Sequence, residues 1–320
     1  MEYFDPVRTA ERLDYDVLVP ALRTGLTEGA VVPPRHHHAL DDGNDATLLL
    51  MPAWNREFLG VKLVDVFPGN TARGLPALSS TYVLADGVTG QHLALVDGGE
   101  LTRRRTVATA ALGASLLSRA DSRVHLIVGT GHIGSGVHDA YSSVRPGIET
   151  TLVADPYNPA GAHALVGALV ERGVNAVAVD DLPVAAGRAD IITTATLARE
   201  PVLRGEWITP GTHLDLIGSF RPEMHEVDTA LLRRATVFID AEAARTEAGE
   251  LVTAFAEGAL GDQDIAATLP ELCPRVEPRP READEITVFK TVGTGLADLI
   301  AAVTVYTSTT EPSRSTDADE

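Results

Sequence analysis

The sequence predicts an α/β protein built around a doubly wound parallel sheet, and three observations support that prediction. Between residues 123 and 240, short apolar runs alternate with segments of helical length, as parallel strands and their crossover helices do. A glycine-rich loop follows the first apolar run, and an aspartate follows the second. Six strands are expected, at residues 125–128, 149–154, 176–179, 190–193, 213–217 and 236–239.

The segments on either side of this region mix helices and strands. Apolar spacing predicts a helix at residues 14–28, and an alanine-rich helix is expected at residues 102–119, with Thr102 as its N-cap. Residues 270–284, rich in Pro, Glu and Arg, are expected to form a loop. Further strands are expected at residues 46–51, 58–67, 80–84, 92–96 and 286–290, and further helices at residues 241–257 and 293–305.

The composition limits the class of partner and the compartment. The formal charge of −19 at pH 7 argues against a nucleic-acid surface and against binding to anionic membranes. No apolar run reaches the roughly 18 to 20 residues that cross a bilayer, and residues 1–10 lack the apolar core of a secretion signal. The single cysteine, Cys273, excludes an intrachain disulfide and favours a cytoplasmic location.

The glycine-rich loop at residues 128–134 predicts a dinucleotide site. It follows an apolar strand, precedes a helical pattern and is followed by an acidic residue at the end of the next strand, which together match the dinucleotide fingerprint. Gly129 suits a tight turn, Gly131 the close approach of a pyrophosphate, and Gly134 the packing of helix on strand. The N-terminus of the following helix presents N–H groups to the phosphates. A purely structural glycine turn is the alternative.

Asp155 ends the second strand, where a carboxylate can accept both ribose hydroxyls and repel a 2′-phosphate. Pro156 follows it, and no arginine nearby would pair with such a phosphate. This pattern favours NAD(H) as cofactor and leaves NADP(H) open. The alternative is that Asp155 only caps the turn before Pro156.

Lysine is scarce in this chain. Of the 26 lysines and arginines, only Lys62 and Lys290 are lysines. We therefore expect each to be a position where arginine cannot replace lysine. Lys62 lies inside the nearly continuous apolar run at residues 59–68, where a cation is costly unless a partner or ligand meets it. We therefore expect Lys62 to face a ligand, with a strand-end lysine that reaches water as the alternative.

Two arginines are candidates to accompany Lys62. Three consecutive arginines on a helix point in three directions, and of these Arg105 precedes small residues that indicate a buried face. Arg35 follows two prolines on a rigid loop. One lysine and two arginines make a set suited to a planar carboxylate. No metal site is expected, because adjacent histidines at residues 36–38 would point to alternate faces and lack a spaced partner.

Several segments resemble one family of proteins. The chain resembles ornithine cyclodeaminase and mu-crystallin, a family that also includes ketimine reductases and some alanine dehydrogenases. The resemblance runs from about Val31 to Val305. The segments that carry it are Met51-Pro52-Ala53, residues 60–64 and 67–70, Leu101-Thr102 with Arg105-Thr106, Gly129-Thr130-Gly131, residues 200–203 and 210–213, and Val288-Phe289-Lys290 with Gly293.

The resemblance implies a discontinuous α+β domain for substrate binding and dimerisation, with a Rossmann domain inserted into it. Residues 1–119 and 286–320 would form the first and residues 120–285 the second, and the protein would be a homodimer. Lys62, Arg105 and Arg35 match the substrate-binding cations of the family. The expected cofactor-binding residues are Arg105, Gly129, Gly131, His132, Ile133, Asp155 and Lys290, with Thr194, Ala195, Thr196 and Ser219 along the nicotinamide half.

One position departs from the cyclodeaminase pattern. Those members carry a catalytic aspartate two residues after the glycine that ends the fifth Rossmann strand, and this chain has Phe220 there. Phenylalanine cannot transfer a proton, so deamination of ornithine lacks its acid–base group. The segment around Phe220 is similar to the branch that reduces cyclic imines. Asp215 is a candidate replacement carboxylate in catalysis, or a strand-end residue bonded to backbone.

These observations predict an enzyme that reduces a small cyclic imino acid with NAD(P)H. The expected reaction converts Δ1-pyrroline-2-carboxylate to L-proline, with the six-membered Δ1-piperideine-2-carboxylate, which gives L-pipecolate, as a further substrate. Lys62 would lie near the imine nitrogen. The alternatives are an ornithine cyclodeaminase, an alanine or other amino-acid dehydrogenase, and a non-catalytic binding protein of the mu-crystallin type.

Overall fold

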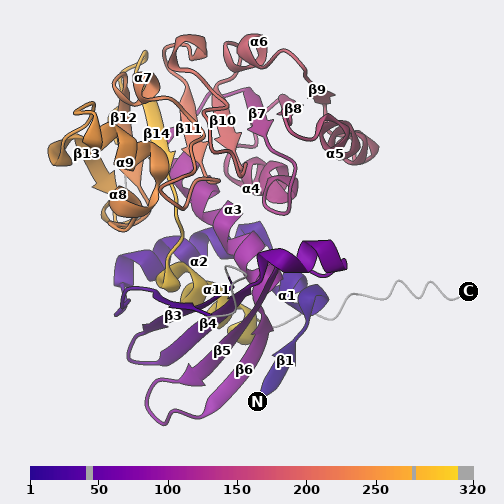
Figure 1. The fold of residues 1–320 in the computed structure, drawn as a ribbon, viewed down its shortest axis with the longest axis vertical. Helices are drawn as coiled ribbons and strands as arrows, with labels where there is room; N and C mark the ends of the chain where they lie inside the picture. The colour runs from indigo at the N-terminus through magenta and orange to yellow at the C-terminus, as the bar shows by residue number, and fades with distance from the viewer. Residues whose placement is uncertain (41–45, 276–278, 309–320) are drawn as a thin grey trace, which may run out of the picture.

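The computed structural model of the chain describes residues 1–40, 46–275 and 279–308. These residues form two halves, each built around one β-sheet, which lie one above the other in Figure 1. A six-stranded sheet with its helices makes up one half of the molecule, and an eight-stranded sheet makes up the other. The long helix α3 (Gly98–Leu117) extends from the first half into the second. The predicted α/β architecture is confirmed.

The six-stranded sheet has the order β1-β6-β5-β4-β3-β2, antiparallel except for the parallel pair β1 and β6. Helices α11 and α3 pack on one face, which buries alternate residues of the central strands such as Lys62 and Val64. The elements of this half are β1 (Glu2–Phe4), α1 (Pro6–Arg12), α2 (Tyr15–Glu28), β2 (His36–Ala39), β3 (Thr47–Trp54), β4 (Phe58–Val66), the 3-10 turn η1 (Pro68–Arg73), β5 (Leu78–Asp86), β6 (His92–Asp97) and α11 (Gly295–Thr307).

The eight-stranded sheet is parallel throughout, with the order β13-β12-β14-β11-β10-β7-β8-β9. The chain starts in the middle at β7, moves outward through β8 and β9, and returns to β10 on the other side, so the strand order reverses between β7 and β10. Ligands of such sheets bind at that switch point. The strands are β7 (Val124–Val128), β8 (Thr150–Ala154), β9 (Ala176–Ala178), β10 (Ile191–Thr194), β11 (His213–Leu216), β12 (Ala235–Ile239), β13 (Ile265–Thr268) and β14 (Ile286–Lys290).

The helical segments that connect these strands lie around the sheet and bury its apolar core. They are η2 (Gly134–Gly136), α4 (Val137–Val144), α5 (Pro159–Glu171), α6 (Leu182–Ala186), η3 (Gly205–Trp207), α7 (Thr229–Leu232), α8 (Ala244–Glu247), α9 (Gly249–Ala256), η4 (Asp262–Asp264) and α10 (Leu269–Leu272). None of the helices in the described ranges is long and apolar enough to cross a membrane.

All six strands predicted for the parallel sheet are present, but some boundaries differ from expectation. Thr102 is not an N-cap: α3 begins four residues earlier, where the Asp97 side chain accepts a hydrogen bond from the Glu100 N–H at 2.7 Å. The helix expected at 241–257 is split into α8 and α9, because Ala248 between them is extended. The loop expected at 270–284 includes the end of α10, and residues 276–278 of it lie outside the described part of the chain.

Strand β14 shifts one predicted domain limit. Residues 286–320 were expected to belong with the N-terminal segment, yet β14 pairs in parallel with β11 and β12. Its five residues are all buried, as a strand inside a sheet covered on both faces requires. The chain therefore leaves the parallel sheet after Lys290, and only the segment that follows, with α11, returns to the first half. Residues 309–320 of that segment lie outside the described ranges.

Candidate active site

Lys62 lies on β4 with its ammonium group in the interior, and only 3% of the residue is exposed. Its Nζ lies 2.8 Å and 3.0 Å from the two carboxylate oxygens of Asp298 on α11. It also donates to the Thr102 hydroxyl at 3.4 Å. The alternative of a strand-end lysine that reaches water is thereby excluded.

Arg105 reaches the same carboxylate from α3. Its Nε lies 2.7 Å from Asp298 Oδ1, so Asp298 is shared between two buried cations. Burial alone would raise the pKa of Asp298, but the charges of Arg105 and Lys62 outweigh it and lower that pKa. Burial lowers the pKa of Lys62 to about 8, with Arg105 acting in the same direction and Asp298 in the opposite one.

Arg35 completes the cluster from the segment before β2. Its Nη2 donates to the carbonyl oxygen of Gly293 at 2.9 Å and lies 3.1 Å from Glu247 Oε2. A side chain at Gly293 would place its Cβ only 2.4 Å from Arg105 Nη1, and the residue has φ of +80°. Both the close approach of Arg105 and the backbone angle therefore require glycine. Asp240 fixes this turn by accepting the N–H groups of Val292 and Gly293 at 3.0 Å and 2.7 Å.

The three cations predicted for the substrate therefore meet around Asp298 and Gly293, at the junction of the two halves of the molecule. They outnumber the carboxylates in direct contact with them, Asp298 and Glu247. Asp240 beside Gly293 offsets part of this positive charge, since the charge of Arg105 opposes the rise that burial causes in the pKa of Asp240. Guanidinium groups orient planar carboxylates through paired hydrogen bonds, so the cluster can hold a small carboxylic acid.

The glycine-rich loop has the geometry that a dinucleotide requires. Gly129 has φ of +101°, and a Cβ there would lie 2.6 Å from the Ala195 carbonyl oxygen. A Cβ at Gly134 would lie 2.0 Å from the Gly129 carbonyl oxygen, whereas one at Gly131 would meet no atom within 4 Å. The first and third glycines are thus needed for packing, and the second leaves open space beside the backbone. That space fits the approach of a pyrophosphate.

Two other residues predicted for the cofactor lie beside this loop. His132 is exposed, and its Nε2 lies 3.4 Å from the Gly99 carbonyl oxygen at the start of α3. Ile133 is partly buried against the core. Their roles toward a cofactor stay predictions.

Asp155 caps the turn after β8, as the alternative reading expected. Its Oδ1 accepts the N–H groups of Tyr157 and Asn158 at 3.1 Å and 2.9 Å. Its Oδ2 accepts the N–H and hydroxyl of Thr130 at 2.9 Å and 2.7 Å, which ties it to the glycine-rich loop. A ribose hydroxyl would have to replace one of these donors, so the contact of Asp155 with a cofactor stays a prediction.

The residues expected along the nicotinamide half lie at the carboxyl ends of β10 and β11. The N–H and hydroxyl of Thr196 each donate to Glu226 Oε1 at 2.9 Å. The Ser219 hydroxyl donates to the Met224 carbonyl at 2.7 Å. Thr194, Ala195 and Lys290 occupy the same edge of the sheet. Lys290, however, is fully buried beside carboxylates, so its role toward a cofactor could only be indirect.

The structure does not bring Asp215 to this site. The residue is fully buried, with Oδ1 3.1 Å from His213 Nε2, and it interacts with Tyr141, whose pKa is raised well above its ordinary value by burial and then by Asp215. Asp215 is therefore a structural residue of the core, but its partners are side chains and not the backbone groups that the alternative expected. Phe220, by contrast, is 39% exposed, with the Arg221 guanidinium 5.9 Å from its ring centre.

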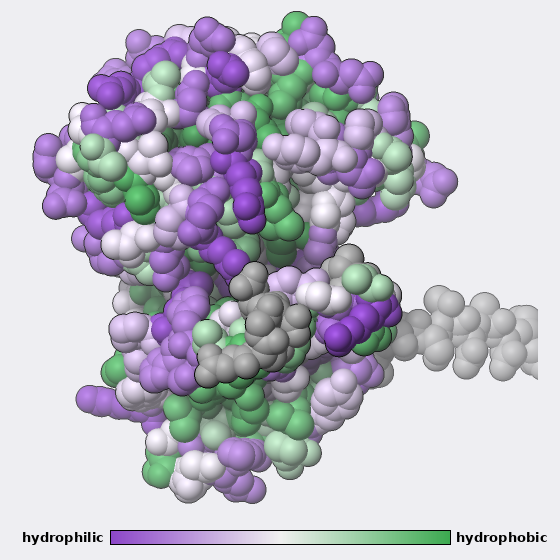
Figure 2. Space-filling model, in the orientation of Figure 1, coloured by the Kyte–Doolittle hydropathy of each residue, from purple (hydrophilic) through white to green (hydrophobic). Residues whose placement is uncertain are grey.

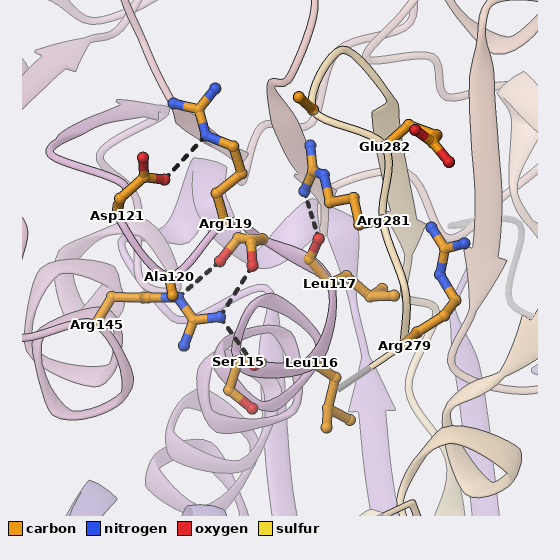
Figure 3. A pocket seen from close by; sticks show the side chains of 12 residues that line it. Ser115, Leu116, Leu117, Arg119, Ala120, Asp121, Arg145, Arg279, Arg281 and Glu282 are labelled. Carbon is orange, nitrogen blue, oxygen red and sulfur yellow. Dashed lines mark hydrogen bonds and ion pairs between the residues drawn. The ribbon is translucent and has the colours of Figure 1, made fainter. Parts of the chain in front are cut away.

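A second group of cations is not part of this site. A cavity of about 360 Å³ at the C-terminal end of α3 is lined by Arg119, Arg145, Arg279 and Arg281 (Figure 3). It lies about 15 Å along the helix from Arg105, at 1.5 Å per residue. Arg145 Nη2 donates to the carbonyls of residues 114, 115 and 118, and Arg281 donates to those of residues 117 and 211.

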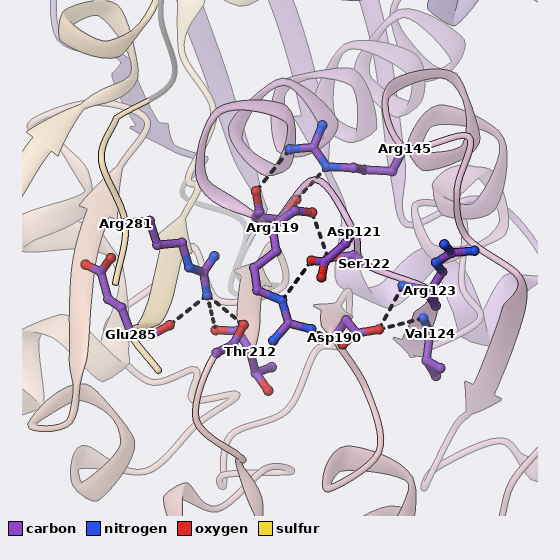
Figure 4. A network of polar contacts seen from close by, with 12 residues as sticks. Arg119, Asp121, Ser122, Arg123, Val124, Arg145, Asp190, Thr212, Arg281 and Glu285 are labelled. Carbon is purple, nitrogen blue, oxygen red and sulfur yellow. Dashed lines mark hydrogen bonds and ion pairs between the residues drawn. The ribbon is translucent and has the colours of Figure 1, made fainter. Parts of the chain in front are cut away.

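Figure 4 shows Arg119, Arg145 and Arg281 between the end of α3 and loops of the parallel sheet, and Arg119 lies 2.6 Å from Asp190. Cations at a helix C-terminus satisfy its free carbonyls and its dipole. We interpret this group as a structural clamp. Among the described residues, no three His, Cys, Asp or Glu side chains are placed to hold a metal ion, and the histidines of β2 are exposed.

Comparison with known proteins identifies the family. A model described as the ornithine cyclodeaminase/mu-crystallin family matches residues 7–313. The chain belongs to the ornithine cyclodeaminase/mu-crystallin family. This is a family of NAD(P)-dependent imino-acid reductases and dehydrogenases.

Three members of the family show how close the similarity is. The Delta(1)-pyrroline-2-carboxylate reductase of Paracoccus denitrificans is 41% identical over 258 residues, 80% of this chain and 81% of that protein. The structure of the Thermococcus litoralis Delta(1)-pyrroline-2-carboxylate reductase with NADH and L-proline matches with a TM-score of 0.88 and 30% identity over 96% of each chain. An archaeal alanine dehydrogenase dimer with bound NAD matches with a TM-score of 0.87 and 27% identity, over 96% of this chain and 95% of that one.

The buried carboxylates of the candidate site were not singled out from the sequence. Asp298 was not singled out, although a lone acid in the apolar helix at 295–307 is the same kind of signal as Lys62 in an apolar strand. Asp240, Glu226 and Glu250 follow strands or lie in loops and helices where acidic residues are common, so their burial left no local signal. Only the fold shows that they face inward.

Proposed function

We propose that this protein reduces Δ1-pyrroline-2-carboxylate to L-proline with NADH. The observation that supports this most is the convergence of Lys62, Arg105 and Arg35 around Asp298 and Gly293, where they can hold a carboxylate beside an imine. The similarity to two proteins named as reductases of this substrate supports it as well. The six-membered Δ1-piperideine-2-carboxylate carries the same two groups and is a further proposed substrate.

In the proposed mechanism, each cation has a separate task. The Nη groups of Arg105 border Gly293, and Arg35 lies on the carbonyl side of the same residue, so the two guanidinium groups can hold the substrate carboxylate between them. Lys62 then faces the imine nitrogen. With its pKa lowered to about 8, Lys62 is charged at neutral pH and holds a proton that it can give up readily. Asp298 keeps the ammonium group in place.

The bound reduced nicotinamide would supply the hydride that reaches the imine carbon. The residues present fit a dinucleotide, because Gly129 and Gly134 pack closely while Gly131 leaves open space. We propose NADH over NADPH, since the Asp155 charge would repel a 2′-phosphate, and three structurally similar proteins are described with NADH, NAD or NAD⁺. NADP(H) is the alternative. A cytoplasmic location belongs to the same proposal and rests on the single, buried cysteine.

We also propose that two copies pair through the outer face of the six-stranded sheet. Across the strands, Pro52, Val61, Val83, Leu95 and Tyr3 lie side by side by register. Four of these side chains are half-buried and Tyr3 is exposed, although they are apolar. Figure 2 shows apolar surface over this half of the molecule. A contiguous apolar sheet face calls for a covering partner, and a similar archaeal alanine dehydrogenase is described as a dimer.

The experiment that tests the proposed function follows NADH oxidation and product together. We expect purified protein to oxidise NADH in the presence of Δ1-pyrroline-2-carboxylate and to form L-proline. With ornithine and NAD, no comparable release of ammonia is expected, because Phe220 cannot transfer a proton. Ammonia release at a comparable rate would favour a cyclodeaminase, and NADH oxidation that requires pyruvate and ammonia would favour an alanine dehydrogenase. NADH binding without turnover of any imine would favour a non-catalytic binding protein.

A further inference from the structure

Three ionisable side chains meet in the interior behind the carboxyl ends of β11 and β14. Lys290, the last residue of β14, has its Nζ 3.0 Å from Glu250 Oε1 and 4.0 Å from Glu226 Oε2. Lys290 and Glu226 are 0% exposed, and Glu250 is 2% exposed. Taking three charges out of water is costly, and a buried ion pair contributes little net stability in return.

Glu226 connects the cluster to the edge of the sheet. Its Oε1 accepts the N–H and hydroxyl of Thr196 at 2.9 Å each, and its Oε2 accepts the Gly218 N–H at 2.6 Å. Thr196 follows β10 and Gly218 follows β11, two neighbouring strands next to the one that leads into the glycine-rich loop. One carboxylate thus joins two of the loops that border the switch point, where ligands of such sheets bind.

The cluster carries an excess of negative charge when its members are ionised, since two carboxylates face one ammonium group. Each Glu226 oxygen accepts a backbone N–H, which favours the ionised form. Burial raises the pKa of Glu226, and the charge of Lys290 opposes that rise. Asp240 is a further carboxylate on that side: burial raises its pKa, and the charges of Arg105 and then Lys290 oppose that rise.

We infer that Glu226 is a positioning residue for the nicotinamide half of the cofactor, and that the excess negative charge around Lys290 favours the oxidised, cationic nicotinamide over the reduced, neutral one. This inference rests on the proposed function, because it requires a dinucleotide at this edge. Glu226 acts through Thr196 and Gly218, whose backbone it holds. Glu250 acts through charge alone, since it makes no hydrogen bond to either loop.

The test compares the dissociation constants of NAD⁺ and NADH, measured by calorimetry, with no substrate present. Glu226→Gln should weaken both cofactors and weaken NAD⁺ more. Glu250→Gln should weaken NAD⁺ relative to NADH by roughly three- to tenfold, the size expected of one charge acting through protein of effective dielectric constant about 20. Glu257→Gln, which makes the same change at an exposed position next to α9, should leave the ratio unchanged.

Thermal unfolding of each variant shows whether it is folded, and Glu250→Gln is sufficient for the test if Glu226→Gln does not fold. An NAD⁺ to NADH ratio that stays at the wild-type value in a folded Glu250→Gln variant would overturn the inference about charge. Unchanged affinity for both cofactors in folded Glu226→Gln would overturn the positioning role. Wild-type protein that binds neither cofactor would instead overturn the proposed function itself.

Discussion

At the scale of single residues, the two lysines share one environment. Both are buried, and both face carboxylates: Lys62 with Asp298, and Lys290 with Glu250 and Glu226. A compact ammonium group can fit a confined position and can change protonation, whereas a guanidinium stays charged and needs a planar space. Both of the scarce lysines are therefore buried, and contact of Lys62 with a ligand stays a proposal.

The protonation of Lys62 gives the pH dependence. We expect kcat/KM for imine reduction to fall as the pH rises through about 8, because the pKa of Lys62 is lowered to about 8 and only the charged form can donate a proton. Asp298 raises that pKa, so Asp298→Asn should move the fall to lower pH. A pH–rate profile of each protein, repeated with a second imine of different basicity, checks this. A fall that follows the substrate and not Asp298 would contradict it.

Lys62, Arg105 and the glycine-rich loop could be singled out from the sequence as candidate site residues, because each breaks a local pattern. The role of Asp155 could not be decided from the sequence, since a carboxylate after a strand can cap a turn or bind a ribose. The structure shows that it accepts hydrogen bonds from four donors of the chain itself. Asp215 was proposed from the sequence as a catalytic residue, but the side chain points among His213 and Tyr141, a direction that depends on which helix covers that face of β11.

At the scale of elements, α3 determines how the two halves fit together. Its N-terminal half places Arg105 against Asp298, and its C-terminal half packs on β14. Gly113 makes that close approach possible, because a Cβ there would lie 2.3 Å from the buried ring of Phe289. The strand in turn ends in Lys290. Both charge clusters are thus held by the same helix and strand.

Gly113→Ala should destabilise the protein by up to about 2 kcal/mol. Overpacking a core costs roughly 1 to 3 kcal/mol, and replacing a helical glycine by alanine returns about 1 kcal/mol at most. Gly167→Ala in α5 is the matched control, because its Cβ meets no atom within 4 Å, and it should be neutral or stabilising. Chemical denaturation of both variants checks the pair. Equal stability changes would show that the Phe289 contact does not limit packing.

Element boundaries were the least predictable feature at this scale. The strands were found because each has a continuous or alternating apolar pattern. The start of α3 was missed because Gly98 and Gly99 are poor helix formers, while the Asp97 cap lets the helix begin there. Strand β14 was found, but not its place between β11 and β12, because pairing partners far apart in the chain leave no local pattern.

At the scale of the whole molecule, the six-stranded sheet has an apolar face that the described helices do not cover. Placing a charge there should prevent two copies from pairing. We expect Val83→Glu to convert a dimer to a monomer, because Val83 lies between Val61 and Leu95 in the middle of that face. Val88→Glu is the control, since Val88 is 82% exposed in the hairpin turn beyond the face.

Sedimentation equilibrium of the two variants and the wild type gives their masses. A wild-type monomer, or a Val83→Glu variant that remains dimeric, would contradict the proposed pairing.

The overall architecture was predictable from the sequence because the resemblance extends over nearly the whole chain. The uncovered sheet face could not be predicted. In β4, apolar residues on both faces make one continuous apolar run, a pattern that is typical of a strand buried on both sides.

The proposed function depends most on Lys62 serving the reaction and not the fold. Lys62→Met keeps the apolar stem and removes the charge, and Asp298 stays paired because Arg105 Nε lies 2.7 Å away. The decisive measurement is L-proline formation from Δ1-pyrroline-2-carboxylate by Lys62→Met, with its NADH affinity and unfolding temperature measured on the same preparation. We expect a folded protein that binds NADH like the wild type and loses turnover by roughly a hundredfold or more, the scale of positioned acid catalysis. Wild-type turnover in that variant would contradict the assignment of this cluster as the active site.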